Sequence, residues 1–507
     1  MGALANHWPW LAGKINPIAV NRLVTVCRTR PHPWSTAHDY VSWTSLTDTS
    51  WSARHLPPVP EALTTPSAEE LTGLFARPGD QVMSDKSTVL FPAFAQYLTD
   101  GFLRTRMPRK GEDENVRLRN TSNHQIDMCP LYGRNVEQTD ALRLKSEARR
   151  ERGRLKSQLV AGEEWAPFMY AGGHKKAEFE VLDDPLGLDP LATPALADRV
   201  FAFGGDRANA TPHVAMLNTL FLREHNRLAG LIEAANPTWD DERVFQTARN
   251  TVIVVFIQIV VEEYINHISS EVYRLKAIPD VAWRAPWNRP NWMTTEFSLL
   301  YRWHSLIPDT ITWDDKAYTI PDMLLNNEPL LNVGLAGAFV GISSQKAARL
   351  GAFNTAPALV PIEKQAIDQG RRVRLAPYTD YRKYMGMSQP ERFEDISQDD
   401  RVVEFLGDVY ERPQDVEFYV GLFAEDPGKN TPLPPLIRAM VAVDAFSQAL
   451  TNPLLSEHVF NEPTFSPAGW AVIRAGSTLD AVVRRNTPDG AVDGRVTMTQ
   501  PGWKRRR

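Results

Sequence analysis

The feature that most constrains the fold is an apolar run of ten residues, Val252-Ile-Val-Val-Phe-Ile-Gln-Ile-Val-Val261, interrupted by a single glutamine. Charged residues bound the run on both sides, with Arg249 before it and Glu262-Glu263 after it. A helix needs about 20 apolar residues to cross a bilayer, so the run is about half a membrane span. Because a helix that is apolar on every side has to be buried, the run predicts a core helix from about residue 238 to about residue 268.

Helical periodicity continues on both sides of this run, and strand-like alternation is rare. Leu217, Leu220, Phe221, Leu228 and Leu231 form one stripe at helical spacing. Further helices are predicted at 88–105, 291–306, 320–327, 333–350, 361–369, 399–407, 413–424 and 434–451. The sequence therefore predicts a mainly α protein, built as one large helical domain with long connectors.

Composition narrows the classes of function and compartment. The chain has 507 residues and a net charge of −5 at pH 7, so nothing in it indicates a nucleic-acid partner. Its two cysteines, Cys27 and Cys129, exclude a disulfide framework and favour a reducing compartment. The N-terminus lacks the basic and then apolar pattern of a secretory signal. We therefore expect a cytoplasmic protein.

The two ends of the chain are predicted to lie outside the main domain. Residues 1–50 form an N-terminal arm in which Trp8-Pro9-Trp10-Leu11 and Ile15–Val26 combine aromatic, aliphatic and a few basic residues. This mixture fits a surface helix in peripheral contact with a lipid membrane. An arm that packs on the main body is the preferred interpretation of the two. Residues 481–507 are expected to form a C-terminal tail.

The stretch Tyr301-Arg-Trp-His304 carries the residue types for redox chemistry. If the stretch is helical, Tyr301 and His304 are three residues apart and share a face. That face would combine a nitrogen that can hold a metal with a phenol that can be oxidised, which suits a haem iron beside a tyrosine. Taken alone, the histidine is better explained as a packed and hydrogen-bonded core residue.

A set of motifs occurring in order along the chain carries a family resemblance. They are Phe94-Ala-Gln-Tyr-Leu-Thr-Asp-Gly-Phe-Leu-Arg-Thr105, Leu131-Tyr-Gly133, Phe221-Leu-Arg-Glu-His-Asn-Arg-Leu228, Asn236-Pro-Thr-Trp-Asp-Asp-Glu242 and Tyr301-Arg-Trp-His304. Together they resemble the peroxidase–cyclooxygenase superfamily, the animal-type haem peroxidases, over roughly residues 35–460. The resemblance is strongest to the fatty-acid-oxygenating branch. It implies a helical catalytic domain over residues 51–480 with haem buried between its core helices.

The resemblance also implies roles for single residues. His304 matches the proximal ligand of the haem iron, and Tyr301 matches the tyrosine whose radical removes hydrogen from a fatty acid. Arg302 is similar to the plant and fungal dioxygenases rather than to the prostaglandin synthases. Tyr419 matches a tyrosine near the proximal histidine that can orient it by a hydrogen bond, and its alternative is an ordinary core residue. Gln96 matches the family's distal glutamine.

One position departs from the family pattern. Family members usually carry a distal histidine four residues after the glutamine, and Asp100 stands there. An aspartate at its usual pKa of about 3.9 donates protons poorly at pH 7, but burial could raise that value. Asp100 therefore either replaces the histidine as acid and base, or leaves peroxide cleavage weak. A third reading is a one-turn shift that brings His124 into this role.

Two further positions bear on the cofactor. The family's calcium-binding aspartate directly follows the distal histidine, and Gly101 occupies that position, so we expect no calcium. The aspartate that forms an ester with haem in mammalian peroxidases precedes the distal histidine, and Thr99 occupies that position. The resemblance therefore implies haem b that is bound without a covalent link.

The expected activity follows from these assignments. The resemblance implies a haem-dependent dioxygenase that uses peroxide, O2 and a tyrosyl radical to convert a fatty acid or other lipid into a hydroperoxide. Tyr301, Gln96 and Asp100 are the expected catalytic residues, with His304, Gln96 and Tyr419 on the cofactor. The alternatives are a peroxidase acting on small reductants and a haem-binding protein with little catalysis.

Overall fold

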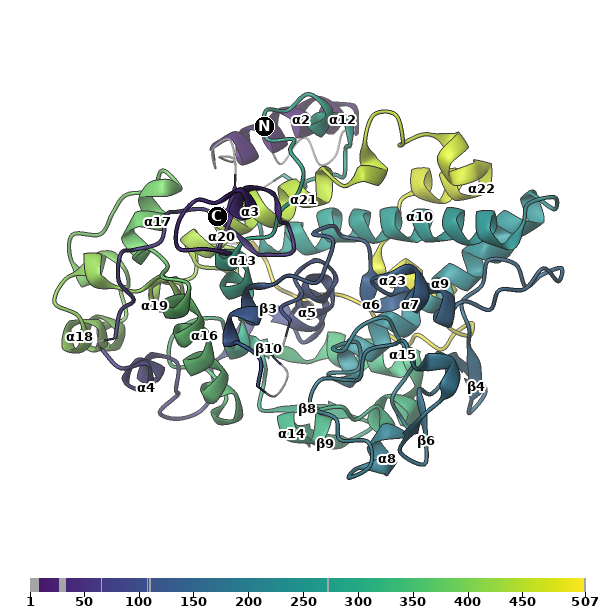
Figure 1. Cartoon of the computed structure of the whole chain (residues 1–507), viewed down its shortest axis with the longest axis horizontal. Coiled ribbons are helices and arrows are strands. Elements are labelled where there is room, and N and C mark those ends of the chain that lie inside the picture. The colour runs from purple at the N-terminus through teal and green to yellow at the C-terminus, as the bar shows by residue number, and fades with distance from the viewer. Residues whose placement is uncertain are drawn as a thin grey trace.

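The structure is a computed structural model that describes residues 9–26, 33–64, 66–106, 108, 111–270 and 273–505, and helices predominate among them (Figure 1). The longer helices are α2 (Pro9–Val26), α5 (Leu90–Phe102), α9 (Pro212–Ala235), α10 (Asp241–Ile259), α15 (Glu328–Ser344), α16 (Val360–Arg372), α18 (Asp400–Val409) and α22 (Glu462–Ala475). The shorter ones are α3 (Trp43–Thr47), α4 (Ala68–Leu71), α6 (Cys129–Tyr132), α7 (Val136–Leu142), α8 (Pro194–Ala197), α11 (Asn266–Ile268), α12 (Asp280–Trp283), α13 (Thr295–Leu300), α14 (Ile320–Met323), α17 (Tyr378–Tyr384), α19 (Phe418–Ala424), α20 (Pro435–Val441), α21 (Ser447–Leu450) and α23 (Leu479–Arg485). This confirms the mainly α fold class.

Strands contribute only small antiparallel pairs in the described part of the chain. The pairs are β1 (Trp34–Ser35) with β2 (Ala53–Arg54), β3 (Met83–Thr88) with β10 (Lys346–Ala348), β4 (Gln158–Val160) with β5 (Glu163–Trp165), β6 (Tyr170–Ala171) with β7 (His174–Lys175), and β8 (Thr310–Trp313) with β9 (Lys316–Thr319). None of these sheets is wide enough to form a core of its own. The core is therefore made by the helices.

Helix α10 runs through the protein as the sequence predicts (Figure 1). Val252, Val255 and Ile257 of the apolar run have no exposed surface, so the run is part of a core helix. The longer helical segment Asp241–Ile268 that contains it would also be long and apolar enough to cross a membrane. The helix begins at Asp241, and Asp240 caps it by accepting a hydrogen bond from the Arg243 amide at 2.8 Å. The start therefore lies a little later than the sequence predicts.

Two helices that cross the core contain π-helical turns. Helix α10 continues through one at Val260–Ile265 into α11, and α20 continues through another at Ala442–Phe446 into α21. A π-turn holds one residue more than the α-helical turn it replaces, and such turns occur often at functional sites. Both lie beside the site described below.

The charged part of α9 is structural. Glu224 is fully buried, and its carboxylate accepts hydrogen bonds from Arg227 at 2.8 Å and from Arg485 of α23 at 2.6 Å. The ring of His225 is held between the Tyr132 hydroxyl at 3.0 Å and the Gly153 carbonyl at 2.8 Å. Buried charges are tolerated when they are paired in this way, so this segment stabilises the packing of α9. Both ring nitrogens of His225 are engaged, so His225 is not available to bind a metal.

The N-terminal arm lies on the main body through one face of α2 (Figure 1). Val20 and Val24 are buried, and the Asn16 side chain donates a hydrogen bond to the carbonyl of Arg274 at 2.7 Å. The opposite face is exposed, with Trp10 at 61% and Ile18 at 70% of their full surface. Trp8 lies outside the described residues.

The C-terminal segment is held along β3. The Thr88 amide donates to the carbonyl of Met498 at 2.9 Å, and the Gln500 amide donates to the carbonyl of Lys86 at 2.7 Å. The division of the chain at residues 50 and 480 stays a prediction.

Candidate active site

The Tyr301–His304 stretch is a turn, and the predicted continuous helix over 291–306 is wrong. Helix α13 ends at Leu300, and a separate 3₁₀ turn begins at His304. The Trp303 indole donates a hydrogen bond to the Leu300 carbonyl at 2.5 Å, which satisfies a group that a longer helix would have used. Tyr301 and His304 are therefore placed by two different elements and do not share a helical face.

One nitrogen of His304 lies against a buried carboxylate. Its Nδ1 is 3.2 Å from Oε2 of Glu363, on α16. The same Oε2 accepts a hydrogen bond from the Tyr419 hydroxyl at 2.5 Å, and Oε1 accepts one from the Thr355 hydroxyl at 3.0 Å. Tyr419, on α19, therefore acts on His304 through Glu363, whereas the sequence suggested a direct contact.

The other nitrogen of His304 is free to bind a metal. Within the described residues, Nε2 has no hydrogen-bond partner, and the side chain keeps 18% of its surface exposed although Nδ1 is buried. A metal-binding histidine commonly turns its second nitrogen toward a carboxylate or carbonyl, which fixes the ring and leaves the first nitrogen for the metal. The residues present thus fit the haem that the sequence implies.

Tyr301 lies in an aromatic cage. Its ring is 4.8 Å from that of Phe297 and stacks on Trp303 at 4.6 Å, measured between ring centroids. The hydroxyl is buried and interacts with that of Tyr264, which comes from the π-turn after α10, but neither has a partner in full hydrogen-bond geometry. Burial raises the pKa of Tyr301 above its usual value, and the charge of Asp444 adds to this effect. The phenol therefore stays protonated at neutral pH.

Helix α5 carries Gln96 and Asp100 and lies beside this turn. Its Phe91 stacks on Trp303 at 5.7 Å. The carboxylate of Asp100 is buried, and its Oδ2 has no hydrogen-bond partner in the described chain. Burial raises the pKa of Asp100 to about 7, against the opposing charges of Arg207 and Arg104. Gln96 is half-buried on the same helix, one turn earlier.

Arg207 is a site residue that the sequence interpretation missed. Its charge acts both on Asp100 of α5 and on Arg302 beside His304, so it lies near both halves of the site. Burial lowers the pKa of Arg302, and the repulsion from Arg207 adds to this. These two guanidinium groups make this part of the site positively charged. The available signal was an Asp-Arg pair after Gly204-Gly205, just before α9.

His124 does not take the role of the distal histidine, which the sequence left open for it. Its Nε2 is 2.6 Å from the Thr49 carbonyl, and its Nδ1 accepts a hydrogen bond from the Met293 amide at 3.0 Å. Both ring nitrogens are therefore engaged in holding loops together, which leaves Asp100 as the candidate acid and base. The Gly101 carbonyl accepts a hydrogen bond from the Cys129 thiol at 2.9 Å, and the absence of calcium stays a prediction.

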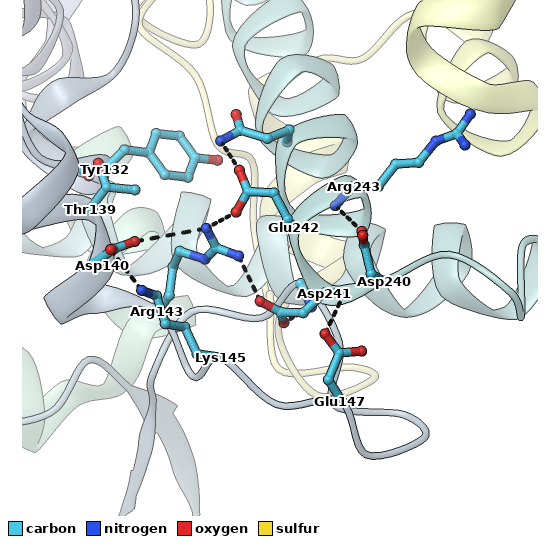
Figure 2. A network of polar contacts seen from close by, with 12 residues as sticks. Tyr132, Thr139, Asp140, Arg143, Lys145, Glu147, Asp240, Asp241, Glu242 and Arg243 are labelled. Atoms are coloured by element: carbon cyan, nitrogen blue, oxygen red, sulfur yellow. Dashed lines mark hydrogen bonds and ion pairs between the residues drawn. The ribbon is translucent and has the colours of Figure 1, made fainter.

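A cavity of about 670 Å³ lies elsewhere, around the start of α10. Its lining residues include a network of ion pairs centred on Arg143, which reaches Asp241 at 2.6 Å and also pairs with Glu242 and Asp140 (Figure 2). These charges largely satisfy one another. The network therefore ties α7 to the first turn of α10.

Comparisons with known proteins agree with this geometry. The family model described as animal haem peroxidase matches residues 76–497. Prostaglandin G/H synthase 1 of Mus musculus is 29% identical, over 96% of this chain and 80% of that protein, and prostaglandin G/H synthase 2 of Equus caballus is 28% identical, over 94% and 77%.

Solved structures show the same fold. A fatty acid alpha-dioxygenase of Oryza sativa superposes with a TM-score of 0.72 at 15% identity, covering 97% of this chain and 94% of that one. Peroxidase A from Dictyostelium discoideum superposes with a TM-score of 0.68 at 16% identity, covering 93% and 100%.

Proposed function

Since this chain belongs to the animal haem peroxidase family and is a haem-dependent oxidoreductase, we propose that its reaction is the dioxygenation of a fatty acid. The family contains fatty-acid oxygenases and peroxidases, so the choice between them has to come from the site. The observation that carries the proposal is the buried hydroxyl of Tyr301, which lies in an aromatic cage beside the hydroxyl of Tyr264. A peroxidase acting on small reductants has no need of such a phenol.

The roles of the residues follow from their positions. His304 holds haem b through Nε2, without a covalent link, and bound haem supplies the oxidising equivalents of peroxide. Asp100 takes a proton from the peroxide and returns it to the leaving oxygen, with Gln96 beside it on α5. Arg207 and Arg302 provide positive charge for the cofactor's carboxylates.

Tyr301 connects this chemistry to the substrate. After it has lost its hydroxyl hydrogen, its oxygen radical removes a hydrogen atom from the acyl chain, which leaves a carbon radical. O2 adds to that carbon, and the resulting peroxyl radical takes back a hydrogen atom from the Tyr301 hydroxyl. The products are a lipid hydroperoxide and the regenerated tyrosyl radical, so each turnover consumes one fatty acid and one O2.

The second candidate is a peroxidase that oxidises small reductants. It is favoured by Asp100, because a carboxyl group with a pKa of about 7 can cleave peroxide whether or not Tyr301 reacts. Product analysis separates the two. Linoleate and palmitate, the second of which accompanies the Oryza sativa dioxygenase in one solved structure, are supplied under ¹⁸O2, and mass spectrometry should find two ¹⁸O atoms in each product. Turnover of guaiacol with no labelled lipid would favour the peroxidase.

Haem ligation by His304 has its own test. We expect the purified protein to bind one haem with a Soret band, and His304→Ala to lose or shift that band because the iron loses its ligand. His458→Ala removes an exposed histidine and should leave the spectrum unchanged. A wild-type protein that shows no Soret band after reconstitution with haem would contradict the whole cofactor assignment.

We also propose that the protein is cytoplasmic and binds membranes peripherally through α2. The exposed Trp10 and Ile18 are accompanied by the exposed Lys14 and Arg22, a composition suited to an anionic lipid surface. Burying one such apolar side chain is worth about 2 kcal/mol. We therefore expect Trp10→Ala combined with Ile18→Ser to reduce sedimentation with phosphatidylserine-containing vesicles by at least about tenfold.

The control for this experiment changes an exposed apolar residue far from α2. Leu159 in β4 is 77% exposed, and Leu159→Ser should sediment with the vesicles as the wild type does. Equal loss of binding in the control and in the α2 variant would show that α2 has no special part in membrane contact.

A further inference from the structure

Glu363 is a buried carboxylate that packing alone does not explain. Glu363 lies on α16 and is 1% exposed. Among the described residues, the basic group in ion-pair contact with it is the His304 ring, which is charged only when it is protonated. Burying a carboxylate is costly unless hydrogen bonds stabilise it. Here the Tyr419 and Thr355 hydroxyls supply such bonds, one to each oxygen.

These hydroxyls also fix the direction of the carboxylate. The Thr355 bond holds Oε1 at 3.0 Å, and the Tyr419 bond holds Oε2 at 2.5 Å on the side that faces His304. The Nδ1–H of His304 is 3.2 Å from Oε2 but does not point straight at it. Hydrogen bonds in active sites are often long or misaligned until the bound complex forms. The carboxylate is therefore placed to accept this hydrogen bond.

We propose that Glu363 is a positioning residue that accepts the Nδ1–H hydrogen bond of His304 and makes the imidazole a stronger electron donor at Nε2. This inference rests on the proposed function, in which His304 holds the haem. A carboxylate withdraws the Nδ1 proton more strongly than a neutral acceptor does and raises the basicity of the ring. A more basic axial ligand stabilises the oxidised iron, so Glu363 lowers the reduction potential of the bound haem.

The central test is Glu363→Gln, which keeps the volume of the side chain and replaces the charged acceptor with a neutral one. We expect the ferric/ferrous midpoint potential to shift to more positive values and the iron–histidine stretching frequency of the ferrous protein to fall. The Soret band should remain, because His304 still binds. Glu394→Gln, at an exposed glutamate, is the matched control and should change neither value.

Tyr419→Phe is a second test, because the expected direction of its potential shift cannot result from a general loss of packing around the haem. The Tyr419 hydroxyl donates to the same oxygen that faces His304, so its removal leaves that oxygen a stronger acceptor. We expect the potential to shift to more negative values, opposite to the shift in Glu363→Gln. Damage to packing would instead move both variants in the same direction.

The outcomes separate this inference from the proposed function. Unchanged potential and stretching frequency in Glu363→Gln, with the Soret band intact, would overturn the role of Glu363 while leaving haem ligation standing. If the wild-type protein did not bind haem through His304, the proposed function itself would be overturned. If Glu363→Gln failed to fold, the sign of the Tyr419→Phe shift would decide, and a shift of zero or to more positive values would contradict the inference.

Discussion

Replacing Tyr301 with phenylalanine is expected to reduce fatty-acid-dependent oxygen uptake to the level of a sample without protein. Phenylalanine fills the same space between Phe297 and Trp303, so the aromatic cage and the fold should survive. It has no hydroxyl hydrogen to lose, so no radical can form at this position to attack the acyl chain. An oxygen electrode measures the effect directly, with palmitate or linoleate and a small amount of peroxide.

The same variant should keep its other properties. We expect an unchanged Soret band, because His304 and Glu363 are untouched, and continued oxidation of guaiacol by peroxide, because that reaction needs no phenol at this position. Tyr318→Phe, on the surface strand β9, removes a phenol far from the site and should retain full oxygen uptake. Undiminished uptake in Tyr301→Phe would show that the radical mechanism is wrong.

The second large effect is expected at Asp100, whose pKa of about 7 places its titration in the working range. The carboxylate form accepts the proton from the incoming peroxide, so cleavage should increase with pH and reach half its maximum near pH 7. Arg104, Arg207 and Asp206 are the charged groups around it. The pH profile of guaiacol turnover between about pH 5.5 and 8.5 measures the effect.

Asp100→Asn should lower the rate of peroxide cleavage by about 10²–10⁴-fold, the usual contribution of a general acid and base, and should flatten the pH profile. Asp100→His is the informative companion variant, because it restores the residue usual in the family at this position. It should retain peroxide cleavage with a pH dependence set by the imidazole. If Asp100→Asn kept the wild-type rate and profile, peroxide cleavage would not depend on this carboxyl group.

Local sequence patterns predicted the parts of the fold that depend on local forces. The apolar run Val252–Val261 has to be buried whatever surrounds it, and it forms the core of α10. The order of the motifs identified the family, which the match over residues 76–497 confirms. The break between Tyr301 and His304 was missed, because it depends on side-chain contacts such as the indole bond to the Leu300 carbonyl.

The residues that surround His304 could not be found from local patterns. Glu363 lies 59 positions later in the chain, in a helix whose sequence reads as an ordinary amphipathic one, and only tertiary packing brings it to Nδ1. Arg207 stands in a loop with no periodicity to mark it. For Asp100 two outcomes were open from the sequence, and the burial of its side chain favours the one in which it works as acid and base.

The two π-turns set the rotational phase of the helices that contain them. A residue added to an α-helix rotates everything after it by about 100°, since one turn takes 3.6 residues. The turn at Val260–Ile265 carries Tyr264, whose hydroxyl meets that of Tyr301, and the turn at Ala442–Phe446 carries Asp444, whose charge acts on the same phenol. The extra residue in each π-turn therefore changes the direction in which the following side chains leave the helix. The two π-turns thus bring Tyr264 and Asp444, from helices far apart in the sequence, to the surroundings of one reactive oxygen.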